Sequence, residues 1–141
     1  MFLDASALVA VLLREPDATA LLKAMEAARG KLRISPVVRM EAVLALARAR
    51  IEARGKGPAT AADYADATGL VDQLLEALEA QDMPITSEIG KGAITALAIY
   101  GKQVGHPAQL NMGDALSYAC AKAEAVPLLY KGRDFSETDL A

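Results

Sequence analysis

The sequence predicts an α/β fold, in which a small parallel sheet of four to five strands lies between helices. Short apolar segments alternate with longer helical ones along the chain, which is the pattern of a parallel sheet covered on both faces. Ala and Leu dominate the composition, and both favour helix. With 141 residues, 53% of them hydrophobic, the chain suits a single domain spanning 1–141.

Residues that typically begin or end helices set the limits of the expected elements. Ser35 as N-cap and Pro36 at the first helical position mark a helix start. Asp17, Asn111 and either Thr86 or Ser87 are further N-caps, and Gly30 is a helix stop. The segment from Lys102 to Leu110 is expected to be a loop. Strands are expected at 1–3, 31–34, 83–85 and 126–130, and helices at 5–14, 18–29, 36–54, 60–80, 87–101 and 112–125. The stretch from Gly55 to about Thr68 begins as a linker-like loop, and the sequence assigns it no role.

Composition excludes several classes of protein. The single Cys120 cannot form an internal disulfide. The apolar run from Ala5 to Leu13 has no basic segment before it and stops at Arg14, unlike a signal peptide. We therefore expect a cytoplasmic protein without membrane segments. The net charge of −3 is not typical of a nucleic-acid binder, but it fits a chain that gathers carboxylates in one place.

Four acids are expected at one edge of the sheet. Asp4 and Asp134 follow the first and last strands, Glu41 lies early in the helix after the second strand, and Asp114 lies in the first turn of the Asn111 helix. Strands of a parallel sheet end at the edge where the following helices begin, and ligands bind there. The four carboxylates are therefore expected to converge.

Each acid taken alone also has a purely structural interpretation. Asp4 fits a helix N-cap, Asp114 fits the acid of a capping box with Asn111, and Asp134 fits a turn. Glu41 is harder to explain in this way, because its helix face is apolar and a buried carboxylate is costly unless something compensates it.

Converging carboxylates repel one another, and a hard cation such as Mg²⁺ or Mn²⁺ relieves that repulsion. No cluster of His and Cys offers a zinc site, since His106 suits a structural or surface role and Cys120 suits the core. Mg²⁺ held by carboxylates suits phosphodiester hydrolysis. Ser6, two residues after Asp4, suits either orientation of Asp4 and metal-bound water or simple helix capping.

The acids lie in four blocks that resemble the motifs of one family. These blocks are Phe-Leu-Asp4-Ala-Ser6, Ile-Ser35-Pro36-Val-Val-Arg-Met-Glu41-Ala, Leu-Asn111-Met-Gly-Asp114-Ala and Tyr-Lys131-Gly-Arg-Asp134-Phe. In order and content they resemble PIN-domain ribonucleases, and within these the VapC-type toxins of toxin–antitoxin pairs.

This resemblance implies a PIN-like fold and a Mg²⁺- or Mn²⁺-dependent endoribonuclease. It implies that Asp4 and Asp114 are direct metal ligands, whereas Glu41 and Asp134 ligate a second ion or hold metal waters. It also implies a homodimer, an RNA substrate and a VapB-type antitoxin. Arg133 departs from the family pattern, and it either contacts phosphate or neutralises Asp134.

Partner and substrate surfaces are predicted less specifically. The helices at 5–14 and 36–54 are apolar enough either to be buried core or to offer a groove for a partner helix or dimer mate. The candidate RNA-binding residues at the rim are Arg14, Arg39, Lys131 and Arg133.

Two rival functions remain. A phosphatase of the haloacid-dehalogenase type needs an Asp where Ser6 stands, and a phospho-receiver needs an acid pair that the chain lacks. A PIN-like scaffold that binds a partner without catalysis is the other rival, and the presence of all four acids speaks against it.

Overall fold

The computed structural model of the chain describes residues 1–140 and has the predicted α/β architecture. Its four strands are β1 (Phe2–Leu3), β2 (Arg33–Ile34), β3 (Gln81–Asp82) and β4 (Leu128–Leu129). All pair in parallel, in the order β3-β2-β1-β4. From β1 the next two strands are added on one side, and β4 is then added on the other side. Open α/β sheets bind ligands at such a switch in strand order.

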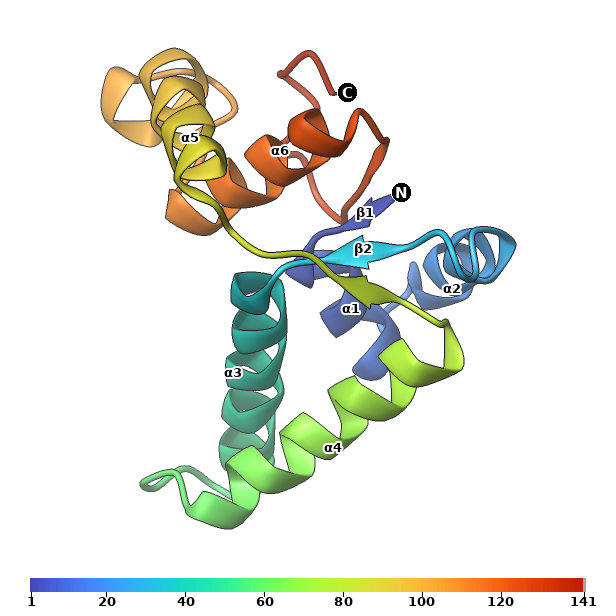
Figure 1. Cartoon of the computed structure of the whole chain (residues 1–141). Helices are drawn as coiled ribbons and strands as arrows, with labels where there is room; N and C mark the ends of the chain where they lie inside the picture. The colour runs from blue at the N-terminus through green and yellow to red at the C-terminus, as the bar shows by residue number, and fades with distance from the viewer. Residues whose placement is uncertain (141) are drawn as a thin grey trace.

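Helices cover both faces of this sheet. In Figure 1, α5 (Ser87–Tyr100) and α6 (Met112–Glu124) lie above it, and α1 (Ala5–Leu12), α3 (Pro36–Ala53) and α4 (Ala61–Ala77) lie below it. Helix α2 (Ala18–Ala27) packs against α1. A 3-10 turn, Lys102–Val104, interrupts the segment predicted as a loop. No helix within residues 1–140 is long and apolar enough to cross a membrane.

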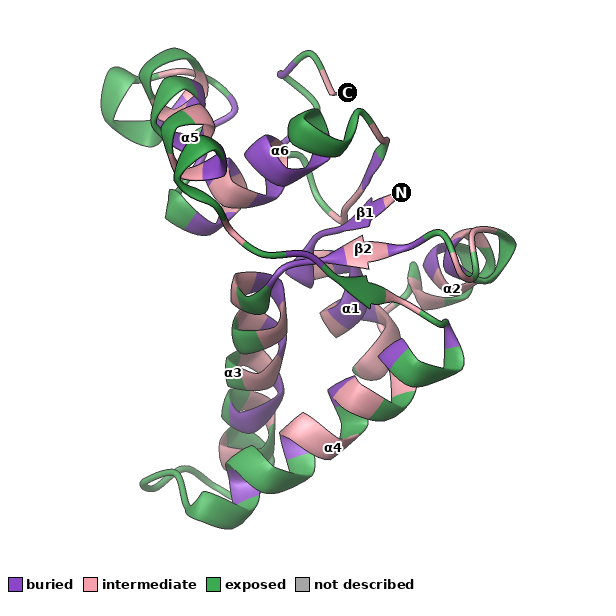
Figure 2. Cartoon of the chain, in the orientation of Figure 1, coloured by how far each residue is buried: buried purple, intermediate pink, exposed green. Residues whose placement is uncertain are grey.

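The core lies where the sheet meets α1 and α6. Phe2, Leu3 and Leu8 are fully buried there, as are Ala115 and Cys120 of α6. Figure 2 shows this concentration of buried residues, and shows that the loop joining α3 to α4 is exposed. Helix α6 contacts β1, and Ser117 of α6 hydrogen-bonds to Asp4 directly after β1, so the N-terminal half of α6 lies at the carboxyl end of β1.

The third strand is displaced from its predicted position. The sequence predicts it over 83–85 because Met83 and Ile85 are apolar, but the structure places it over the exposed residues Gln81 and Asp82. An edge strand bonds to only one neighbour, and β3 pairs with β2 alone, so its residues need not be apolar. Met83 is buried just after the strand, which explains the misplacement.

Helix caps follow the sequence closely, with one exception. The Ser35 and Thr86 side chains accept from the third residues of their helices, at 3.2 Å in each case. Asp17 stands at the N-cap position of α2 but makes no capping hydrogen bond. Gly30 has a φ of +75°, which is consistent with its predicted role in ending the helical segment.

The stretch that had no predicted role joins the two long helices. Asp63 forms a capping box with Thr60 at the start of α4, and its buried carboxylate also pairs with Arg54 and Arg50 of the preceding segment. These hydrogen bonds hold the pKa of Asp63 well below its usual range, Arg54 being the largest cause. This cluster fixes α3 against α4.

Candidate functional site

Asp4 occupies the centre of the carboxyl edge and is held by three hydrogen bonds. It follows β1 directly, and it is 5% exposed. Its Oδ2 accepts from the Ser6 amide at 3.0 Å and from Ser6 Oγ at 2.5 Å, and its Oδ1 accepts from Ser117 Oγ at 2.7 Å. The N-cap role considered from the sequence is therefore real, and the same contacts fix the carboxylate in one orientation.

Ser117 is a site residue that the sequence analysis missed. It is 1% exposed and lies on α6, three residues after Asp114. Residues three apart share a helix face, so the position of this hydroxyl on the same face as Asp114 was the available signal.

Ser6 links two parts of the site. Besides donating to Asp4, its hydroxyl accepts from the Lys131 amide at 3.0 Å. This bond attaches the segment after β4, which carries Asp134, to the start of α1. Of the two roles left open for Ser6, the structure supports orientation of Asp4.

Glu41 lies in the second turn of α3, half-buried against the first turn of α6. Burial raises the pKa of Glu41 to about 7, and the negative charges of Asp4 and Asp114 add to this effect. A carboxyl group that is desolvated and faces like charges is the arrangement that a cation would relieve.

Asp114 forms the predicted capping box with Asn111. Its Oδ2 accepts from the Asn111 amide at 2.9 Å, and Asn111 Oδ1 accepts from the Asp114 amide at 3.0 Å. Burial raises the pKa of Asp114 to about 6; the bond from Asn111 opposes the rise, and the charges of Asp4 and Asp134 support it. The charges of Asp4 and Asp114 act on Glu41, and those of Asp4 and Asp134 act on Asp114. All four predicted acids therefore lie in one neighbourhood, with Asp134 exposed in the loop after β4.

No protein cation compensates these charges within the described chain. None of the four acids forms a salt bridge within residues 1–140, and Arg133 does not pair with Asp134 there. In the same residues, no group of three or more His, Cys, Asp or Glu side chains is arranged to hold a metal ion. The carboxyl edge therefore gathers carboxylates that no cationic side chain within residues 1–140 neutralises, although no three of them form a group that could hold a metal ion.

The four basic residues predicted at the rim divide into two pairs. Arg39 is bound to Asp72 and Asp82, and Lys131 is bound to Glu15, so both side chains are already engaged. Arg14 and Arg133 are exposed, and neither forms a salt bridge within 1–140. These two remain the better candidates for contact with an anionic ligand.

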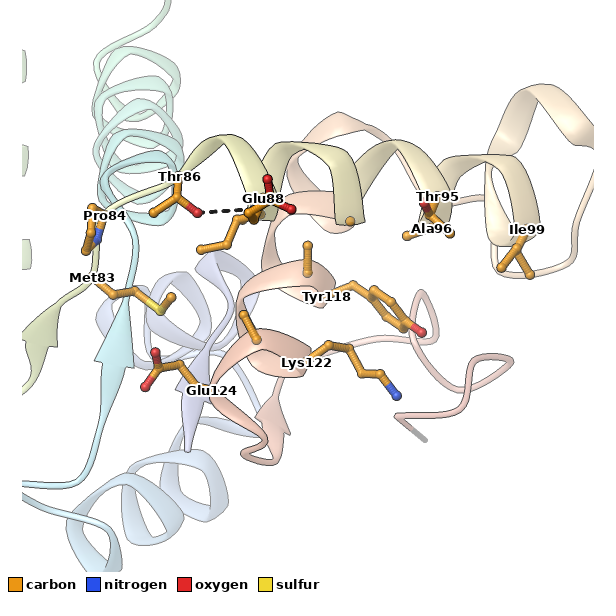
Figure 3. Close-up of a pocket in the computed structure, with 14 residues that line it drawn as sticks. Met83, Pro84, Thr86, Glu88, Thr95, Ala96, Ile99, Tyr118, Lys122 and Glu124 are labelled. Carbon is orange, nitrogen blue, oxygen red and sulfur yellow. Dashed lines mark hydrogen bonds between the residues drawn. The ribbon is translucent and has the colours of Figure 1, made fainter.

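A pocket lies away from the acids, between α5 and α6 (Figure 3). Its volume is about 650 Å³, and none of the four acids lines it. Two of its polar members are engaged with Asp139, since Tyr118 Oη donates to it at 2.6 Å and Lys122 Nζ at 2.9 Å. The chemistry of this pocket is therefore distinct from that of the acidic edge.

His106 has the structural role expected of it. Its Nδ1 accepts from the Ala108 amide at 3.1 Å, and its ring meets Tyr100 edge to face at 5.1 Å. Burial raises the pKa of the Cys120 thiol to about 11, which suits a core residue and not a nucleophile.

Comparison with known proteins identifies the family. The family model described as PIN domain matches residues 1–140. The chain belongs to the PIN-domain family. The VapC ribonuclease R02377 of Rhizobium meliloti (strain 1021) is 49% identical to it over 140 residues, covering 99% of this chain and 98% of that protein.

Other PIN-domain relatives carry the same kind of name. Ribonuclease VapC42 of Mycobacterium tuberculosis (strain ATCC 25618 / H37Rv) is 35% identical over 140 residues, covering 99% of this chain and 96% of the relative. The crystal structure of Mycobacterium tuberculosis VapC20, described as a Sarcin-Ricin loop cleaving toxin, matches 96% of this chain and 92% of its own, with a TM-score of 0.69 at 15% identity. At that identity the likeness concerns the fold, and it confirms the predicted PIN fold.

Proposed function

We propose that this PIN-domain chain is a Mg²⁺- or Mn²⁺-dependent endoribonuclease, the toxin of a VapBC-type toxin–antitoxin pair. The names of its relatives support ribonuclease activity. The observation that supports metal dependence is the gathering of four carboxylates at the carboxyl edge, where burial and neighbouring negative charges raise the pKa values of Glu41 and Asp114 to about 7 and about 6.

Asp4 and Asp114 are the proposed direct ligands, and Glu41 and Asp134 would ligate a second ion or hold metal waters. All four supply only carboxylate oxygens, the donors that Mg²⁺ and Mn²⁺ prefer. When bound, such an ion activates water and stabilises the charge that develops on the phosphate.

The chain's own residues contribute orientation of the ligands and contacts to the substrate. The hydroxyl groups of Ser6 and Ser117 hold the Asp4 carboxylate in place, and such orienting partners tune ligand strength. Arg14 and Arg133 would contact phosphates of the RNA, because they are exposed and unpaired within residues 1–140.

The antitoxin is proposed to cover the apolar face between α3 and α4. Met40, Leu44 and Tyr64 are 57%, 40% and 43% exposed there, and they line a hollow of about 480 Å³. Exposed apolar patches of this kind mark interaction sites, and an amphipathic helix fits such a groove. A homodimer is proposed on the family resemblance and is tested by the mass of the purified protein in solution.

The decisive experiment is cleavage of a labelled mixed RNA pool by purified protein with Mg²⁺, Mn²⁺ or EDTA. We expect cutting with either metal, none with EDTA, and none by the Asp4→Asn, Asp114→Asn variant. Glu26→Gln, an exposed acid on α2, is the matched control and should cut normally. If folded protein free of antitoxin cuts nothing under any metal, the non-catalytic scaffold becomes the better interpretation.

A further inference from the structure

Gly113 is the second residue of α6, and the space beside its Cα is already occupied. A Cβ at this position would overlap Glu41 Oε1, and would lie 2.8 Å from Glu41 Cδ and 3.1 Å from Oε2. Non-bonded carbons normally stay about 3.5 to 4.0 Å apart. Any side chain at position 113 therefore requires the Glu41 carboxylate to move by about 1 Å.

The backbone conformation does not require a glycine at position 113. Gly113 is not among the residues with positive φ, so an alanine can adopt its conformation. Two other helical glycines, Gly69 in α4 and Gly90 in α5, have no neighbouring atom within 4 Å of the place that a Cβ would take. Gly113 differs from them because its missing side chain makes room for a candidate site carboxylate.

We propose that Gly113 is a positioning residue, whose missing side chain lets the Glu41 carboxylate reach the first turn of α6 beside Asp114. The expected effect on metal binding rests on the proposed function, but the contact between Glu41 and Gly113 is independent of it. Glu41 belongs to α3 and Asp114 to α6, so their closeness depends on how nearly the two helices approach. A glycine at the crossing point allows that approach without moving either helix.

The consequence for the site follows from the size of the displacement. Catalytic and ligand geometry is sensitive to shifts of about 1 Å, which can reduce a rate by about 100-fold. A bulkier residue at 113 is expected to weaken metal binding, because it moves one carboxylate away from the others. Gly113→Ala should still fold, since the far end of Glu41 is flexible and alanine is the better helix former. Displacing the Glu41 carboxylate offsets part of the stability that alanine adds.

The first arm of the test measures metal binding. Gly113→Ala and the control Gly69→Ala are compared with the wild type by Mn²⁺ titration calorimetry. We expect Gly113→Ala to bind Mn²⁺ about 10 to 100-fold more weakly, the effect typical of disturbed orienting residues, and Gly69→Ala to bind it as the wild type does. Wild-type Mn²⁺ affinity in Gly113→Ala would overturn the proposal.

The second arm needs no metal. Urea unfolding in EDTA is measured for wild type, Gly113→Ala, Glu41→Ala and the double variant. If the Glu41 carboxylate occupies this space, Gly113→Ala raises the urea midpoint more when residue 41 is alanine than when it is glutamate. Equal shifts in the two backgrounds would refute the contact. If the wild type bound no Mn²⁺, the proposed function would fail, and this arm would still decide the role of Gly113.

Discussion

Replacing Ser117 with alanine removes one of three hydrogen bonds to the buried Asp4 carboxylate. Ser117 Oγ donates to Asp4 Oδ1 at 2.7 Å, and both residues are almost fully buried. Hydrogen bonds to charged groups contribute about 1.5 to 3 kcal/mol to stability. Water cannot easily replace the lost donor at a site that is 1% exposed, so we expect a loss within that range.

This free-energy change converts into a measurable shift in melting temperature. For a chain of this size, 1 kcal/mol corresponds to about 2 to 4 °C, so Ser117→Ala should lower Tm by about 3 to 12 °C. Loss of a partner that orients a metal ligand typically weakens metal binding by about 10 to 100-fold. The assays are differential scanning calorimetry in EDTA and Mn²⁺ titration calorimetry.

The control for this prediction is Thr95→Ala. Thr95 Oγ1 donates to the Lys91 carbonyl on the exposed face of α5, so this variant also loses a hydroxyl but leaves the acids untouched. It should bind Mn²⁺ normally and change Tm little. An unchanged Tm together with an unchanged Mn²⁺ affinity in Ser117→Ala would refute the view that this hydroxyl holds Asp4.

Three further predictions follow from the charges and the exposed surfaces. In EDTA, stability should fall as pH rises from 5 to 8. The folded state keeps protons on Glu41 (pKa about 7 against 4.5 ordinarily) and on Asp114 (pKa about 6 against 3.8) that the unfolded chain releases. Glu41→Gln should make this Tm profile less steep, most of all above pH 6, and an unchanged profile in that variant would contradict the assignment. The double variant Arg14→Ala, Arg133→Ala should weaken RNA binding and reduce the slope of log affinity against log salt concentration by about one per lost phosphate contact. Arg48→Ala, which removes an exposed arginine on α3, should change neither. Fluorescence anisotropy at several salt concentrations measures both quantities. The double variant Met40→Asp, Leu44→Asp should bind the cognate antitoxin more weakly in biolayer interferometry and still cleave RNA. Normal antitoxin binding by this variant would place the antitoxin on another surface.

The fold was predictable because local signals and topology agree. Ser35, Thr86 and Asn111 cap the helices that the sequence assigns to them, and apolar segments mark three of the four strands. The strand over Gln81–Asp82 was not predictable in place, since it lies at the sheet edge and its side chains are exposed. Hydrophobicity carries no information about such a strand.

The acids of the candidate site were predictable, but the contacts around them were not. Asp4, Glu41 and Asp114 follow from the rule that the carboxyl ends of parallel strands form the ligand-binding edge. The bond from Ser117 to Asp4 joins residues 113 positions apart, and the contact of Glu41 with Gly113 depends on a helix crossing. The pairing of Arg39 and Lys131 with acids likewise depends on tertiary packing, so a sequence alone cannot distinguish them from free rim residues.

The central claim is that these acids together bind a divalent cation, and direct Mn²⁺ binding tests it best. Electron paramagnetic resonance can count bound Mn²⁺ at about neutral pH for the wild type, the Asp4→Asn, Asp114→Asn variant and the Glu26→Gln control. We predict bound Mn²⁺ in the wild type and the control, competition by Mg²⁺, and loss of binding in the double variant. Equal binding by the double variant, or no binding by folded wild type, would contradict this account.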